Sequence, residues 1–278
     1  MTTLISPDEL RALITAAAAS PVVLDVRWKL GGAPGHGEYL TGHVPGAVYV
    51  DLDTELARHG KPQDGRHPLP DRHSLQASAR RWGLHDGSPV VVYDADGNLG
   101  AARAWWLLRW AGVNDVRILD GGLPAWVEAG GELSLDDVVP EEGDVTLEPG
   151  ALPTLALEDV ADFARSGVLL DARAHERYRG ETEPIDPKAG HVPGAVSAPT
   201  SANLGPDGRF LPAEALRKRF EAVGVSDDAH VGVYCGSGVT AAHEIAALSV
   251  AGFDAALFPG SWSQWCNHDL PVATGPEA

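Results

Sequence analysis

The sequence predicts an α/β protein built from two similar domains, each with a mainly parallel sheet flanked by helices. The chain has 278 residues, a length that suits two domains better than one. Short apolar, β-branched runs alternate with helical patterns along it, and motifs recur in the same order in its two halves. A strand, a helix and a second strand in this order form a βαβ unit, whose two strands are parallel.

The internal repeat is clearest in two short motifs. Gly-His-Val-Pro-Gly-Ala-Val occupies residues 42–48 and again residues 190–196. Leu-Asp-Val-Arg at 24–27 is matched by Leu-Asp-Ala-Arg at 170–173. Because the matches are collinear, the two halves are copies of one structural unit.

The domain boundary is predicted from composition. Residues 132–153, between the two copies, are acidic and rich in proline and glycine, as exposed linkers are. We therefore predict a first domain over residues 1–140, a linker over 141–152 and a second domain over 153–278.

The predicted elements have the same order in both copies. Those of the first copy are strands at 22–24 and 90–93, a helix at 101–111 and a strand at 116–119. Those of the second copy are strands at 168–170 and 230–234, a helix at 240–251 and a strand at 255–258. We expect the last helix to end before Gly252, because glycine commonly follows the final helical residue.

Composition and charge exclude several classes of partner. The net charge of −18 repels nucleic acid and anionic membranes, so neither is an expected partner. No apolar run approaches the ~18 residues of a membrane span, and the N-terminal residues do not resemble a secretion signal, so we expect a cytoplasmic protein. The two cysteines are too few for a disulfide framework and have no zinc-site spacing, and we expect no metal and no cofactor.

Cys235 is the strongest candidate for chemistry. It closes a predicted buried strand and precedes an alanine-rich helix, and ligands of α/β sheets bind beyond the carboxyl ends of the strands. The glycines at 236 and 238 let successive backbone N–H groups point inward at the helix start, which stabilises a negative charge. We therefore expect Cys235 to be a nucleophilic thiolate, and Cys266 to be a buried, inert thiol.

The motifs also carry a family resemblance that spans nearly the whole chain. Cys-Gly-Ser-Gly-Val-Thr-Ala at 235–241 resembles the active-site loop of 3-mercaptopyruvate sulfurtransferases. The repeated Gly-His-Val-Pro-Gly-Ala and the Gly-Ser-Trp at 260–262 resemble signatures of the rhodanese domain. The resemblance implies a parallel five-stranded sheet in each domain, and activity in the C-terminal domain alone. Asp94 stands where the first copy would need its cysteine, and a carboxylate cannot accept sulfur.

The reaction that this resemblance implies is sulfur transfer through a persulfide on Cys235. The donor would be 3-mercaptopyruvate, and the acceptor a small thiol, thioredoxin or cyanide. The loop residues implied to surround the donor are Gly236, Gly238, Val239 and Thr240.

Further site residues are implied by matching motifs. Arg177 matches the family's carboxylate-binding arginine, and its planar fork suits that group. Arg179 is a second, weaker candidate for the same role. Members specific for 3-mercaptopyruvate typically carry another arginine after the next Glu-Pro, but residues 181–188 contain none.

A hydrogen-bonded set is also implied. Ser237, His67 and Asp53 match residues that would help to protonate the leaving pyruvate, with the carboxylate orienting the imidazole. By contrast, His43 and His191 recur in both copies although one copy lacks the cysteine, which favours a structural role such as pinning a turn. The repeated Asp-x-Arg pairs at 25–27 and 171–173 are interpreted in the same way, as ion pairs at strand ends.

Three other functions have some support from the sequence or from proteins that share this fold. A thiosulfate sulfurtransferase is the nearest: the neutral loop favours monoanionic mercaptopyruvate over dianionic thiosulfate, whereas the missing arginine points the other way. A persulfide carrier without turnover is also compatible with the sequence. A phosphatase is excluded, because Ala241 stands where a Cys-x5-Arg loop needs its arginine.

Overall fold

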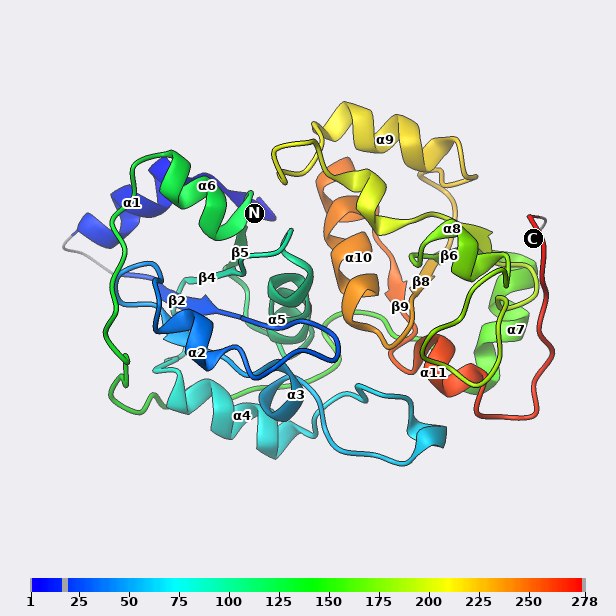
Figure 1. Cartoon of the computed structure of the whole chain (residues 1–278), viewed down its shortest axis with the longest axis horizontal. Coiled ribbons are helices and arrows are strands. Elements are labelled where there is room, and N and C mark those ends of the chain that lie inside the picture. Colours follow the sequence, from blue (N-terminus) through cyan, green and yellow to red (C-terminus); the bar gives the residue numbers. More distant parts are fainter. Residues whose placement is uncertain (1, 17–19, 277–278) are drawn as a thin grey trace. The chain divides into compact units, whose positions relative to one another are not determined.

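The computed structural model describes residues 2–16 and 20–276, which form two compact units (Figure 1). The first unit contains the described residues up to Arg58, together with Pro70–Leu152 and Pro206–Arg209. The second contains His59–Leu69, Pro153–Gly205 and the described residues from Phe210 onward. Residues 59–69 thus belong to the second unit, although in sequence they lie inside the first copy.

The first unit is organised around a parallel sheet. Its strands are β1 (Leu4–Ile5), β2 (Val22–Asp25), β3 (Val48–Tyr49), β4 (Val90–Tyr93) and β5 (Val116–Leu119). Among the residues that the structure describes, this sheet has five strands in the order β1-β5-β4-β2-β3, and each adjacent pair is parallel. The strands predicted at 22–24, 90–93 and 116–119 are confirmed.

Helices cover this sheet. They are α1 (Pro7–Thr15), α2 (His36–Tyr39), α3 (Leu52–Glu55), α4 (Arg72–Arg81), α5 (Leu99–Trp110) and α6 (Gly122–Glu128). The helix predicted at 101–111 is α5, which packs against β4 and β5. Trp105 and Trp106 on α5 are buried in the core. A helix whose faces are mostly apolar is expected to be buried.

The second unit repeats the arrangement. Its strands are β6 (Val168–Asp171), β7 (Val196–Ser197), β8 (Val231–Tyr234) and β9 (Ala256–Leu257), paired in parallel in the order β7-β6-β8-β9. The fifth strand implied for this domain is reduced, within the described part of the chain, to a single parallel bridge between Thr154 and Leu257. Pro153 precedes that bridge and has no N–H to extend the ladder.

Helix α10 is the central helix of the second unit. The helical segments are η1 (Pro62–Asp64), α7 (Leu157–Ser166), α8 (His175–Tyr178), η2 (Thr200–Asn203), α9 (Ala213–Glu221), α10 (Val239–Ala251) and α11 (Ser261–Trp265). Helix α10 follows β8 directly, packs against α9 and η2, and ends before Gly252 as predicted (Figure 1). The segment after β8 is therefore held between a buried strand and a buried helix.

The repeated Asp-x-Arg motifs form buried ion pairs at the ends of β2 and β6. Arg27 Nε lies 2.7 Å from Asp25 Oδ1, and Arg173 Nη2 lies 2.6 Å from Asp171 Oδ2. Both arginines also donate to a backbone carbonyl of the following Gly-His-Val-Pro-Gly turn. The predicted structural role of these pairs is confirmed.

The repeated histidines of that turn are buried in both units. His43 Nδ1 lies 3.0 Å from the Tyr39 carbonyl oxygen, and His191 Nδ1 lies 2.8 Å from that of Tyr178. Each imidazole also stacks on the same tyrosine ring. The prediction that each histidine pins a turn through a ring hydrogen bond is confirmed.

The described residues contain neither a membrane-spanning helix nor a metal-binding cluster. Over residues 2–16 and 20–276, none of the helices combines the length and the apolar character that a bilayer crossing needs. In the same residues, no cluster of histidine, cysteine and acidic side chains has the arrangement of a metal site.

Candidate active site

Cys235 lies at the carboxyl end of β8, in the loop that leads into α10. Its Sγ atom accepts a hydrogen bond from the Gly238 N–H at 3.1 Å, and its own N–H donates to Ser261 Oγ at 3.1 Å. Its carbonyl oxygen accepts from the Trp262 N–H at 2.9 Å. The residue is buried, and the backbone on both sides of the thiol is fixed by these contacts.

The loop turns into the helix at Gly238. This residue has a φ of 82°, a left-handed conformation that favours glycine, and it caps α10. Val239 and Thr240 are the first helical residues. The first N–H groups of a helix have no partner within it and carry the positive end of its dipole, so this turn stabilises negative charge on Sγ.

The equivalent loop of the first unit shows what this turn binds. Asp94 follows β4 as Cys235 follows β8, and its side chain is buried. Its carboxylate accepts hydrogen bonds of 2.8–3.1 Å from the backbone N–H groups of Asp96, Asn98, Gly100 and Ala101. Burial raises the pKa of Asp94, and these N–H groups oppose that shift. The strand-to-helix loop of this fold therefore directs backbone N–H donors at the side chain that follows the strand, a carboxyl group in one unit and a thiol in the other.

Ser237 and His67 form a hydrogen-bonded pair at the Cys235 loop. His67 Nδ1 lies 2.7 Å from Ser237 Oγ, and both side chains are buried. His67 reaches this position because residues 59–69 belong to the second unit. Asp53, the third residue of the implied set, lies in α3 of the first unit, where it accepts a hydrogen bond from Trp28 Nε1 at 2.9 Å. Its membership of the set stays a prediction.

Arg177 lies on α8 and is held by acidic neighbours. Its Nη2 atom lies 2.7 Å from Glu183 Oε1 and 3.4 Å from Asp186 Oδ2. Burial of Glu183 raises its pKa, but the hydrogen bonds and charge of Arg177, together with the backbone N–H groups of Ile185 and Asp186, outweigh burial and leave that pKa below its ordinary value. A Cβ atom on Gly236 would lie 3.5 Å from Arg177 Nη1, so this guanidinium is next to the Cys235 loop.

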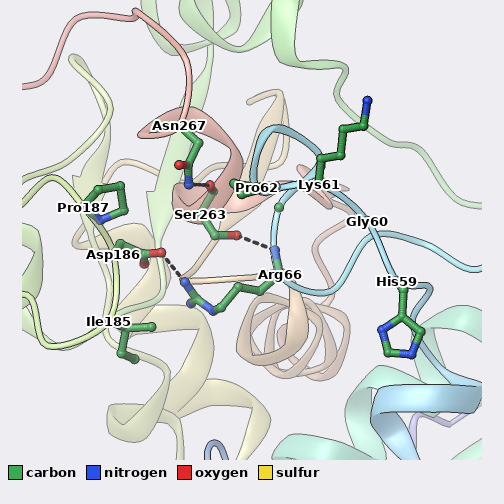
Figure 2. Close-up of a pocket in the computed structure, with 11 residues that line it drawn as sticks. His59, Gly60, Lys61, Pro62, Arg66, Ile185, Asp186, Pro187, Ser263 and Asn267 are labelled. Atoms are coloured by element: carbon green, nitrogen blue, oxygen red, sulfur yellow. Dashed lines mark hydrogen bonds and ion pairs between the residues drawn. The ribbon is translucent and has the colours of Figure 1, made fainter.

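The structure adds Arg66, which the sequence analysis missed. Its backbone N–H donates to Ser263 Oγ at 3.0 Å, and its guanidinium pairs with Asp186 (Figure 2). A Cβ atom on Gly236 would lie 2.9 Å from Arg66 Nη2. No motif marks Arg66, because its distance from Cys235 in sequence hides their proximity.

A cavity of about 340 Å³ in the second unit is lined in part by Arg66. Figure 2 shows Arg66 extending along it toward Asp186, with Ser263 and Asn267 on α11 and just beyond it. Asn267 Nδ2 donates to the Ser263 carbonyl oxygen at 2.8 Å, which fixes this wall. Arg66 is thus shared between the cavity and the Cys235 loop.

Two other predicted residues lie in different surroundings. Arg179 pairs with Glu181 at 2.7 Å and lines a separate cavity of about 270 Å³ beside Tyr178. Cys266 is buried, as predicted, and its Sγ lies 3.8 Å from the Ser263 carbonyl oxygen. Burial raises the pKa of Cys266 to about 11, so its thiol is protonated at neutral pH.

Comparison with known proteins agrees with this fold and loop. The model of the rhodanese-like domain matches residues 6–129 and 156–268. A protein of Mycobacterium tuberculosis provisionally named thiosulfate sulfurtransferase SseB is 49% identical over 279 residues, covering 98% of this chain and 97% of that protein. The 3-mercaptopyruvate sulfurtransferase of Escherichia coli is 36% identical over 248 residues, covering 84% of each chain. The chain therefore belongs to the rhodanese family, and the predicted fold and sulfurtransferase class are confirmed.

Solved structures give the same result. The crystal structure of SseA from Escherichia coli, a 3-mercaptopyruvate sulfurtransferase, superimposes with a TM-score of 0.81 at 31% sequence identity. That match covers 94% of this chain and 99% of SseA. The ergothioneine biosynthesis enzyme of Chlorobium limicola matches with a TM-score of 0.84 at 22% identity, which shows a shared fold alone.

Proposed function

We propose that this protein transfers sulfane sulfur from 3-mercaptopyruvate, through a persulfide on Cys235, to a thiol or cyanide acceptor. The observation that carries the proposal is the Cys235 loop. Its Sγ receives the Gly238 N–H at the start of α10, and the buried pair of Ser237 and His67 lies beside it. A thiolate nucleophile, an anion-stabilising turn and a proton relay are the groups that this reaction needs.

In the first half-reaction, the Cys235 thiolate attacks the sulfur of 3-mercaptopyruvate. An S–S bond forms, the C–S bond breaks, and its electron pair leaves on carbon as the enolate of pyruvate. Uptake of one proton converts the enolate to pyruvate, and Cys235 is left as a persulfide. The Gly238 N–H and the dipole of α10 stabilise the charge on the attacking and the loaded sulfur.

Ser237 and His67 supply the proton in this scheme. The Ser237 hydroxyl, hydrogen-bonded to the imidazole, polarises the developing enolate oxygen or transfers the proton to the leaving carbon. Asp53 would orient His67, as triad logic requires. Val239 and Thr240 contribute backbone N–H groups of the first helical turn toward the donor.

In the second half-reaction, the acceptor attacks the outer sulfur of the persulfide. The S–S bond breaks, its electron pair returns to Cys235 as a thiolate, and the acceptor leaves with one more sulfur. A small thiol, thioredoxin and cyanide all suit this step. Both cysteines are free thiols in the structure, which supports a reducing compartment, and we place the protein in the cytoplasm.

The first unit, which includes the residues 141–152 that were predicted as a linker, would be inactive and structural, and the second unit, which carries Cys235, would be catalytic. Asp94 supports this assignment, because its carboxyl group already accepts the backbone N–H donors of the equivalent loop in the first unit. A carboxylate in that position has no means of carrying sulfur.

Thiosulfate is the second candidate donor. The observation in its favour is the similarity to SseB of Mycobacterium tuberculosis, which is provisionally named a thiosulfate sulfurtransferase. The side chains that follow Cys235 in the loop are neutral, which favours a monoanion over the thiosulfate dianion.

Steady-state turnover with cyanide as acceptor tests these assignments. Each donor is supplied separately, and thiocyanate is measured. We expect a higher kcat/KM with 3-mercaptopyruvate than with thiosulfate, and a persulfide on Cys235 detected by intact mass after donor alone. A higher kcat/KM with thiosulfate would reverse the donor assignment. A persulfide that forms without turnover would identify a carrier.

A further inference from the structure

Two arginine side chains approach the Cys235 loop from separate parts of the second unit. Arg66 comes from residues 59–69 and Arg177 from α8. A Cβ atom on Gly236 would lie 2.9 Å from Arg66 Nη2 and 3.5 Å from Arg177 Nη1. The residue directly after the nucleophile thus has to be small, and one nitrogen of each guanidinium faces it.

The other sides of both guanidiniums are held by carboxylates. Arg66 Nη1 pairs with Asp186 (Figure 2). Arg177 Nη2 lies 2.7 Å from Glu183 Oε1 and 3.4 Å from Asp186 Oδ2. The Glu183 and Asp186 side chains are each only 3% exposed. Within the part of the chain that the structure describes, Arg66 Nη2 and Arg177 Nη1 donate to no protein acceptor. The two carboxylates therefore hold the two guanidiniums on the side away from the Cys235 loop. Arg66 Nη2 and Arg177 Nη1 remain directed toward the loop.

The charges of this group of four residues cancel. Two guanidiniums and two carboxylates have no net charge when all are ionised, yet the two front nitrogens still offer directed N–H donors. A planar carboxylate has two oxygens that can each accept such a donor. A dianion gains less, because no excess positive charge is present to balance its second negative charge.

We propose that Arg66 and Arg177 together form a clamp for the donor carboxylate, and that Glu183 and Asp186 make this clamp selective for a monoanion over thiosulfate. Arg66 supplies a second guanidinium, which residues 181–188 do not contain. The inference rests on the proposed function for the identity of the donor. It extends that function by assigning a binding residue and the origin of donor selectivity.

The first test measures binding without turnover. In a Cys235→Ser protein, 3-mercaptopyruvate is titrated by calorimetry, with and without Arg66→Gln. Loss of a charged hydrogen bond to the carboxylate should weaken binding roughly 10- to 100-fold. Arg66→Lys should recover part of the loss, because it keeps the charge but not the fork.

The matched control is Arg217→Gln on α9. Arg217 also pairs with two carboxylates, Glu221 and Asp227. It is not one of the two arginines that approach Gly236 in the Cys235 loop. We expect binding to be unchanged by this substitution. If Arg66→Gln binds 3-mercaptopyruvate as tightly as the control does, Arg66 does not bind the donor and the clamp is refuted.

A second variant separates donor binding from support of the loop. Arg66→Gln alone removes one of the two guanidiniums that pair with the buried Asp186 carboxylate. The less compensated charge of Asp186 could then disturb the Cys235 loop. The double variant Arg66→Gln/Asp186→Asn removes that unpaired charge, and its binding should stay weak. Recovery of wild-type affinity in the double variant would show that Arg66 only neutralises Asp186.

Donor selectivity is tested in the protein that retains Cys235. Asp186→Asn leaves the group with one excess positive charge, so the ratio of kcat/KM for thiosulfate to that for 3-mercaptopyruvate should rise roughly tenfold. An unchanged ratio would refute the charge-balance argument. Absence of turnover with every donor would instead reject the proposed function, and the binding data on Cys235→Ser would still report on Arg66.

Discussion

We predict that Glu244 links the stability of the folded protein to pH. It lies on α10, the helix that starts at the Cys235 loop, and its side chain is fully buried. Asn203 Nδ2 donates to Glu244 Oε2 at 2.6 Å, and Arg219 Nη1 lies 3.5 Å from Oε1. Burial raises the pKa of Glu244 from 4.5 to about 7, and outweighs the opposing effect of Arg219.

The sign of the effect follows from proton binding. In the unfolded chain Glu244 loses its proton near its ordinary pKa of 4.5, whereas in the folded protein it keeps the proton up to about pH 7. Between these values the folded state binds more protons, so the free energy of unfolding falls as pH rises and levels off above about pH 7. A pKa difference of this size corresponds to about 3 kcal/mol.

Glu244→Gln tests this reasoning. Glutamine keeps the size and the oxygen acceptor for Asn203 but cannot ionise. Between pH 5 and pH 8, ionisation of Glu244 should lower the free energy of unfolding of the wild type by about 3 kcal/mol. We expect this decrease to be absent in the variant. Urea unfolding of both proteins at several pH values measures the difference. Glu221→Gln, at a half-exposed position on α9, is the control and should leave the pH profile unchanged. Parallel profiles for the wild type and Glu244→Gln would refute the assignment.

The remaining predictions concern sulfur transfer. Cys235→Ser should abolish turnover with the fold intact, whereas Cys266→Ser should keep most of it; an equal loss in thiocyanate assays would contradict the ranking of the two thiols. Arg177→Ala should cost on the order of 2–5 kcal/mol in kcat/KM for 3-mercaptopyruvate and less in the cyanide step, and equal losses in both half-reactions would show that it supports the loop. Ser237→Ala should lower kcat/KM with 3-mercaptopyruvate about tenfold or more, and less with thiosulfate, because sulfite leaves without a proton. His67→Ala should show the same preference between donors, and no change with either would remove His67 from the mechanism.

Much of the fold was predictable because its signals are local. The buried strands at β2, β4, β6 and β8 are continuous apolar runs, and α10 is marked by its alanine-rich pattern and the following Gly252. The repeated Gly-His-Val-Pro-Gly motif revealed the duplication of the chain, and the duplication predicted two similar sheets. The nearly lost fifth strand of the second sheet was not predictable, because Pro153 and Thr154 pair only through contacts with Leu257.

The proposed nucleophile, Cys235, was also predictable from the sequence alone. Cys235 follows a strand and precedes a glycine turn and a helix, and the backbone of that turn brings the Gly238 N–H to its sulfur. The loop is recognised from consecutive residues, so no knowledge of contacts between distant parts of the chain was needed to find it.

The surroundings of Cys235 were decided only by tertiary structure. Residues 59–69 lie within the first copy of the sequence but pack in the second unit, and this brings Arg66 and His67 to Gly236 and Ser237. Sequence spacing carries no record of such an exchange, because the contacts depend on how a loop packs and not on the order of elements. The charge balance between Arg66, Arg177 and their buried acids has the same origin, since burial and pairing exist only once the chain has folded.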